Sequence, residues 1–129
     1  MNIIPEIKTI ITNANRTDDI NKLIDYNLRL AGYLFLLAEQ EDAAYREYLD
    51  AYNARKEFEA SYCLSSTSGI TKAEKEAIVK SKEHREIEVA TEILHNKYKG
   101  VRTSTSEFIS VLSQKISILR REVELSKKQ

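Results

Sequence analysis

Apolar residues recur at helical spacing through one uninterrupted stretch from Asp19 to Tyr62. The stretch holds no proline and one glycine, Gly32, so nothing in it forbids a continuous helix. The pattern predicts one long helix, drawn over residues 18–62, with a helix-pairing seam on one face. The seam is a strict heptad series of Leu23, Leu30, Leu37, Ala44, Ala51 and Phe58.

The segment from Leu30 to Ala38 (LAGYLFLLA) is apolar on every face of such a helix. A helix that is apolar all round is normally buried all round. At about 1.5 Å per residue the whole helix would be roughly 65 Å long, more than a compact chain of this size is wide. We therefore expect identical copies to supply part of the burial, in a homo-oligomer. The segment is about half of a membrane span, so no membrane partner is expected.

A polar tip separates the long helix from the next helical segment. We place it at residues 63–70, where SSTSG at Ser65 to Gly69 cannot continue a helix. Thr71 and Glu74 have the spacing of a capping box, which predicts that the next helix starts there.

The C-terminal segment, residues 71–129, is predicted to hold a charged helix and then an amphipathic arm. Gly100 and the TSTS run of residues 103–106 weaken helix locally, so we draw helix to about Tyr98 and again from about Ser104 to Leu125. The apolar stripe that supports this prediction advances in steps of three and four and includes Leu94, Tyr98, Val101, Thr105, Phe108, Leu112, Ile116 and Leu119.

The N-terminal segment, residues 1–17, is predicted to be a short helix and a linker. Five isoleucines lie at helical spacing around Pro5, which suits a first helical turn, and we draw this helix over residues 5–14. Thr17 or Asp18 is expected to cap the long helix. The whole chain, residues 1–129, is thus predicted to be a single all-α domain: a long helical hairpin with an amphipathic C-terminal helix.

Charge and cysteine content restrict the function classes. Lys and Arg balance Asp and Glu at 20 each, so no global field draws the molecule to nucleic acid or to an anionic membrane. The basic residues are nevertheless enriched from Lys97 onward, which makes the C-terminal third a basic arm. One cysteine, Cys63, cannot form an intrachain disulfide, and the N-terminus lacks a signal-peptide pattern. We expect a cytoplasmic protein.

Enzymatic motifs are scarce, and no cofactor is expected. The segment Glu92-Ile-Leu-His95 has the E-x-x-H spacing of di-iron helix bundles, but the chain has no second copy of it. The acidic pairs Glu39-x-x-Asp42 and Glu83-x-x-Glu86 could clamp Mg²⁺ in an all-α nucleotide hydrolase. We expect these groups to be solvated surface, and we predict that the chain is not an enzyme.

Aromatic and basic residues gather near the end of the long helix. Tyr45, Tyr48 and Tyr52 form a stripe that Arg55 and Lys56 follow directly. Rings beside cations suit single-stranded nucleic acid, because bases stack on the rings and phosphates pair with the cations. The alternative is that the tyrosines belong to the helix seam. Further candidate phosphate ligands lie across the tip at Lys72, Lys75 and Lys80.

The arrangement resembles the phage recombination mediator family typified by UvsY of T-even phages. The resemblance covers roughly residues 45–125 and rests on Tyr52-Asn-Ala-Arg-Lys, the polar gap, the charged run from Lys72, Tyr98 and an amphipathic helix at residues 106–122. It implies a non-enzymatic protein that binds single-stranded DNA, forms homo-oligomers and helps a RecA-like recombinase displace single-strand-binding protein. Arg55 and Lys56 best match the family's DNA contacts, although Glu57 and Glu59 follow them.

The leading hypothesis is therefore a single-stranded DNA-binding recombination mediator. The alternative is a phage scaffold or coiled-coil adaptor that joins proteins and binds no nucleic acid. Both use the apolar stripes, whose expected oligomerisation residues are Leu30, Leu34, Leu37, Phe108, Leu112, Ile116 and Leu119.

Overall fold

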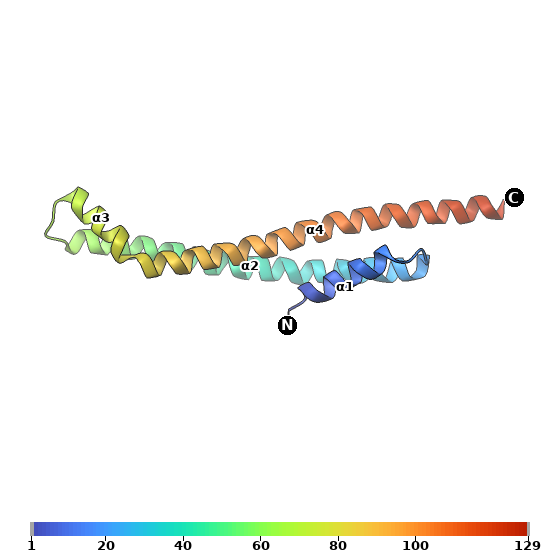
Figure 1. The fold of residues 1–129 in the computed structure, drawn as a ribbon, viewed down its shortest axis with the longest axis horizontal. Helices are drawn as coiled ribbons and strands as arrows, with labels where there is room; N and C mark the ends of the chain where they lie inside the picture. Colours follow the sequence, from blue (N-terminus) through green and yellow to red (C-terminus); the bar gives the residue numbers. More distant parts are fainter. Residues whose placement is uncertain (1, 129) are drawn as a thin grey trace. The chain divides into compact units, whose positions relative to one another are not determined.

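The computed structural model describes residues 2–128, and its regular secondary structure is entirely helical. Four helices follow one another: α1 (Ile4–Asn15), α2 (Ile20–Ser65), α3 (Ile70–Lys80) and α4 (Lys82–Lys127) (Figure 1). The all-α prediction is confirmed for this part of the chain. None of these helices combines the length and the apolar run that a membrane span needs.

The contacts of the chain gather into two compact units. Unit 1 comprises residues 1–39 and 99–129, and unit 2 comprises residues 40–98. Both long helices, α2 and α4, contribute one segment to each unit. The single domain predicted over residues 1–129 stays a prediction.

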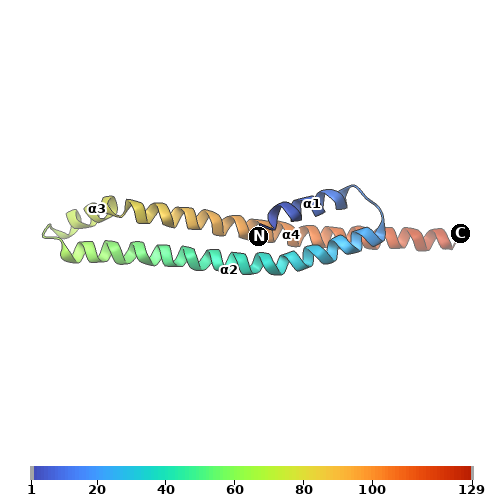
Figure 2. The same cartoon turned by 90° about the horizontal axis from the view of Figure 1, so that it is seen from below.

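Unit 1 has a core of large aliphatic side chains. In it the Tyr33 hydroxyl of α2 donates to the Glu6 carboxylate of α1, and Figure 2 shows α1 running beside the C-terminal part of α4. The short N-terminal helix forms because Pro5 stands in its first turn and its isoleucines share one face. The buried residues of unit 1 are Ile3, Ile4, Ile7, Ile10, Ala14, Leu23, Leu30, Leu37, Thr105, Leu112 and Ile116.

The turn between α1 and α2 is held by polar groups. The ammonium of Lys115 donates to the carbonyl oxygens of Thr17, at 2.9 Å, and Ala14, at 3.4 Å, so it satisfies the end of α1. The helix cap expected at Thr17 or Asp18 is wrong by one residue. Asp19 is the cap, since its Oδ1 accepts from the backbone amides of Asn21 and Lys22.

The heptad seam of α2 is confirmed: its residues are buried from Leu23 to Ala51, and Phe58 is half-buried. The burial expected on every face of residues 30–38 is not reached within this chain. Phe35 keeps 78% of its surface exposed, and Leu28 and Leu36 on the same helix are exposed too.

Unit 2 has small side chains inside and large ones outside. Its buried residues are Ala44, Ala51, Ala73, Ala77 and Ser81, which let the helices approach closely but remove little apolar area from water. Its exposed large apolar residues include Leu64, Ile70, Ile78, Val79, Ile87, Val89 and Ile93.

The capping box predicted at Thr71 and Glu74 is wrong. The capping box does not form, because α3 already begins at Ile70, with Gly69 at the cap position in extended conformation and no side-chain cap bond. Thr71 is therefore inside the helix. Close by, Glu76 accepts a hydrogen bond from the Tyr62 hydroxyl at 3.0 Å.

The helix break after the tip also lies elsewhere than predicted. It is at Ser81, whereas α4 runs unbroken through Gly100 and the TSTS run. A mid-helix glycine costs only about 1 kcal/mol relative to alanine. Buried Thr105 satisfies its hydroxyl by donating to the carbonyl oxygen of Val101 at 2.7 Å, so packing prevails over weak local propensity.

Candidate nucleic-acid and protein interfaces

Arg55, the first predicted phosphate ligand, is engaged inside unit 2. Its guanidinium pairs with Glu88 on α4 through Nε and through Nη2, the latter 3.2 Å from Oε1, and it contacts Glu59 one turn along α2 at 3.3 Å. Its side chain is 11% exposed. The hydrogen bond with Glu88 raises the pKa of Arg55, which keeps it charged. This geometry makes Arg55 a cross-link between α2 and α4.

Glu59 extends the same network to the break between α3 and α4. Its Oε1 accepts from the Ser81 hydroxyl at 2.9 Å and from Arg85 at 2.7 Å. Burial raises the pKa of the Glu59 carboxyl, but these hydrogen bonds and the charges of Arg85 and Arg55 outweigh it, so the net pKa lies below the usual value.

Ser81 explains why the helix breaks there. Its hydroxyl is within hydrogen-bond distance of the Glu59 carboxylate and of the Ile78 carbonyl oxygen, at 3.1 Å, and it accepts from Arg85 Nε. A single hydroxyl proton can serve only one acceptor at a time. Serine bonding back to the preceding turn bends helices, and here the buried carboxylate of Glu59 adds to that pull.

The predicted tyrosine stripe lies along the contact between α2 and α4 in unit 2. The Tyr45 ring packs on His95 with centroids 5.1 Å apart, and Tyr48 lies between Tyr45 and Tyr52. The Arg55 guanidinium and the Lys56 ammonium both sit over the Tyr52 ring, at 5.3 and 5.6 Å. Tyr48 and Tyr52 are half-buried, whereas Tyr45 is 45% exposed. These contacts favour the helix-seam interpretation over a platform for bases.

The predicted lysines of α3 are placed differently from Arg55. Lys72, Lys75 and Lys80 are exposed and line one shallow recess of about 360 Å³ together with Tyr62 and Val79. Glu76 lies in the same recess, where its carboxylate accepts a hydrogen bond from the Tyr62 hydroxyl, so the recess holds one acidic side chain beside its three lysines. We name Tyr62, Lys72, Lys75 and Lys80 the lysine recess. The structure thus brings the three lysines together with a tyrosine that the prediction had not selected.

The residues predicted for oligomerisation are largely internal. Leu30 and Leu37 have no exposed surface, and Leu112 and Ile116 are buried with them in unit 1. Leu34, Phe108 and Leu119 are half-buried. The exposed apolar residues are others. In unit 1 they include Leu28, Phe35 and Leu36 on α2 and Val111 and Ile118 on α4, and unit 2 exposes a further group on α3 and α4. The heptad pattern predicted which residues pack in a helix seam. It could not tell whether that seam lies within one chain or between two chains.

The residues of the E-x-x-H segment and the acidic pairs do not come together as a metal site in the described part of the chain. Glu88, one turn before the E-x-x-H, pairs with Arg55, and the His95 ring packs on Tyr45. Within residues 2–128 no group of three or more His, Cys, Asp or Glu side chains could hold a metal ion.

Comparisons with known proteins add no family. The chain matches no protein-family model, no curated protein and no solved structure. The resemblance to the recombination mediators therefore stays a prediction.

Local charge sets a limit on any anion-binding surface. Unit 2 carries nine Lys and Arg against twelve Asp and Glu, so it is acidic as a whole. Binding of a polyanion to unit 2 therefore depends on a local cluster of basic side chains, which the lysine recess provides. It also depends on several copies of the chain presenting that cluster together.

Proposed function

We propose that the chain is a non-enzymatic mediator that binds single-stranded DNA through the lysine recess and acts in the cytoplasm, assisting a RecA-like recombinase. The observation that carries the proposal is the grouping of Lys72, Lys75 and Lys80 around Tyr62. Ammonium groups contact phosphates without reading sequence, and an aromatic edge beside them offers a surface for a base.

The proposal moves the DNA contact away from Arg55. Glu88 and Glu59 neutralise that guanidinium, and a phosphate would have to displace two carboxylates to reach it. Lys56 is exposed next to it and serves in this proposal as a peripheral contact.

The test is a titration of labelled single-stranded oligonucleotide with the triple variant K72E/K75E/K80E. The matched control is K22E/K97E/K127E, which changes the net charge equally at exposed lysines outside the recess. We expect the recess variant to bind much more weakly than wild type at low salt and the control to bind as wild type does. Equal loss in both, or none in either, contradicts the proposal.

A second candidate is the adaptor that binds no nucleic acid. The inverted burial of unit 2, with alanines inside and large apolar residues outside, favours it. An adaptor fails to bind the oligonucleotide even at low salt, and it tolerates charge reversal in the lysine recess.

A further inference from the structure

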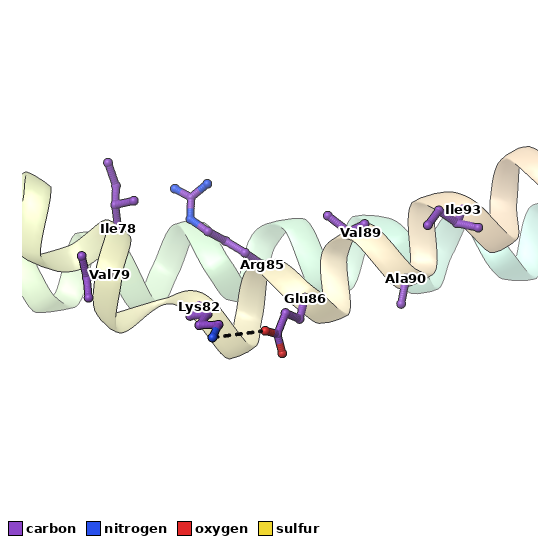
Figure 3. Close-up of a pocket in the computed structure, with 8 residues that line it drawn as sticks. All are labelled: Ile78, Val79, Lys82, Arg85, Glu86, Val89, Ala90 and Ile93. Atoms are coloured by element: carbon purple, nitrogen blue, oxygen red, sulfur yellow. Dashed lines mark ion pairs between the residues drawn. The ribbon is translucent and has the colours of Figure 1, made fainter.

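An open apolar groove of about 540 Å³ lies on α3 and the first turns of α4, within unit 2. Figure 3 shows its side chains. Ile78 and Val79 form one end, and Val89, Ala90 and Ile93 form the other. We name these five residues with Lys82 and Glu86 the α3–α4 groove.

The centre of the groove is charged with both signs. Lys82 and Glu86 lie between the two apolar ends, with Nζ and Oε1 4.0 Å apart. Their side chains are 81% and 65% exposed, so this pair is loose and solvated. A solvated pair at this distance contributes little to folding and can exchange partners.

The apolar ends of the groove are open to solvent. Val79 is 73% exposed and Ile93 is 64% exposed. Arg85 also lines the groove, where its guanidinium is bound to Glu59 at 2.7 Å and its side chain is 41% exposed. Lys82 and Glu86 therefore have apolar groove residues before and after them along the chain, and Arg85 beside them is already paired with Glu59.

Along the chain the groove presents an apolar end, then the positive Lys82, then the negative Glu86, then a second apolar end. If a second copy runs in the opposite direction, its charges and apolar ends match those of the first. In an antiparallel pair centred between Lys82 and Glu86, each Lys82 faces the Glu86 of the other copy. The same register sets the end formed by Ile78 and Val79 against the end formed by Val89 and Ala90. A foreign partner would need both an apolar helix and this particular charge order, whereas a second copy has both by symmetry.

We propose that the α3–α4 groove pairs with the α3–α4 groove of a second copy across a two-fold axis. The contact joins two reciprocal Lys82–Glu86 pairs with apolar contacts on both sides of them. It uses none of the lysines of the lysine recess, although Val79 lines both the recess and the groove.

Charge reversal at Lys82 or Glu86 tests whether the two residues pair between copies. K82E alone puts four acidic groups in the contact, and E86K alone puts four basic groups in it, so each raises the dimer dissociation constant by about tenfold or more. An equimolar mixture of K82E and E86K restores both opposite-charge pairs, but only between unlike chains. Sedimentation equilibrium of each variant and of the mixture measures the mass directly.

The expected result is reduced mass for each variant alone and recovered mass for the mixture. The double variant K82E/E86K recovers as well. The matched control E92K alters an exposed glutamate of the same helix outside the groove and keeps the wild-type mass. A monomeric wild-type chain, single variants with wild-type mass, or a mixture that fails to recover overturns the proposal. Because Lys82 and Glu86 are exposed, far-ultraviolet circular dichroism should show every variant folded.

Discussion

Arg55 on α2 and Glu88 on α4 hold each other through two hydrogen bonds, 33 residues apart in the chain. Both side chains are nearly buried, at 11% and 14% exposed. The residue that looked most like a phosphate ligand is therefore a charged link between α2 and α4 in unit 2, where buried apolar area is small.

The first prediction concerns this link. Arg55→Ala leaves Glu88 with no cation and Glu59 with only Arg85, so it lowers the free energy of unfolding by about 3 kcal/mol or more. The double variant R55M/E88M loses much less, because no buried charge is left unpaired. Urea denaturation measures both. Lys56→Ala, at the exposed neighbour, is the control and changes stability by less than about 0.5 kcal/mol. Equal effects of R55A and K56A contradict the structural role.

The second prediction follows from the lowered pKa of Glu59. Because the carboxyl is more acidic in the folded state, its contribution is fully present above the pKa of an unfolded glutamate. It is lost as the pH falls through the lower, folded value. Wild type should therefore lose thermal stability on acidification more steeply than E59Q, which should be less stable near neutral pH. Parallel melting curves of the two proteins from neutral to acidic pH would argue against this role.

The third prediction uses the uninterrupted course of α4. Gly100 has a negative φ, and a Cβ at this position meets nothing within 4 Å. Gly100→Ala should stabilise the chain by about 0.5–1 kcal/mol, because alanine loses less backbone freedom on folding. Gly69→Ala is the contrast, since glycine is preferred to alanine at a helix cap. Thermal unfolding compares them, and destabilisation by G100A would mean that the helix does break there.

The fourth prediction compares a buried seam residue of α2 with an exposed apolar residue of the same helix. Leu30→Ala removes a fully buried side chain and should cost about 2–5 kcal/mol. Phe35→Ala removes a mostly exposed ring and should change the stability of the monomer by less than about 0.5 kcal/mol. Denaturant unfolding at low protein concentration is the measurement. A large loss in F35A under those conditions would show that the ring is covered.

The local sequence pattern was enough to predict an all-helical chain and the seam of α2, but not where the C-terminal helices begin and end. Leu23, Leu30 and Leu37 are buried as their spacing predicted, because heptad periodicity alone decides which face of a helix can pack. The break at Ser81 could not be predicted, since it depends on Glu59, which approaches only after the chain has folded back.

The candidate site was predictable only in part. Arg55 and Lys72 were selected by residue type, and type does not tell a paired cation from a free one. Glu88 lies 33 residues from Arg55, and no local signal joins them. Tyr62 was passed over because it stands apart from the stripe at Tyr45, Tyr48 and Tyr52, and only the fold of the tip brings it to the lysines of α3.

The salt dependence of single-stranded DNA binding tests the central claim most directly. For single strands the slope of log K against log salt is about −0.7 per neutralised phosphate, so three recess lysines contribute about −2 for each protomer engaged. Fluorescence anisotropy at several salt concentrations should show a wild-type slope that becomes shallower by about that amount in K72E/K75E/K80E. Absence of binding at low salt, or an unchanged slope in the variant, would contradict the account.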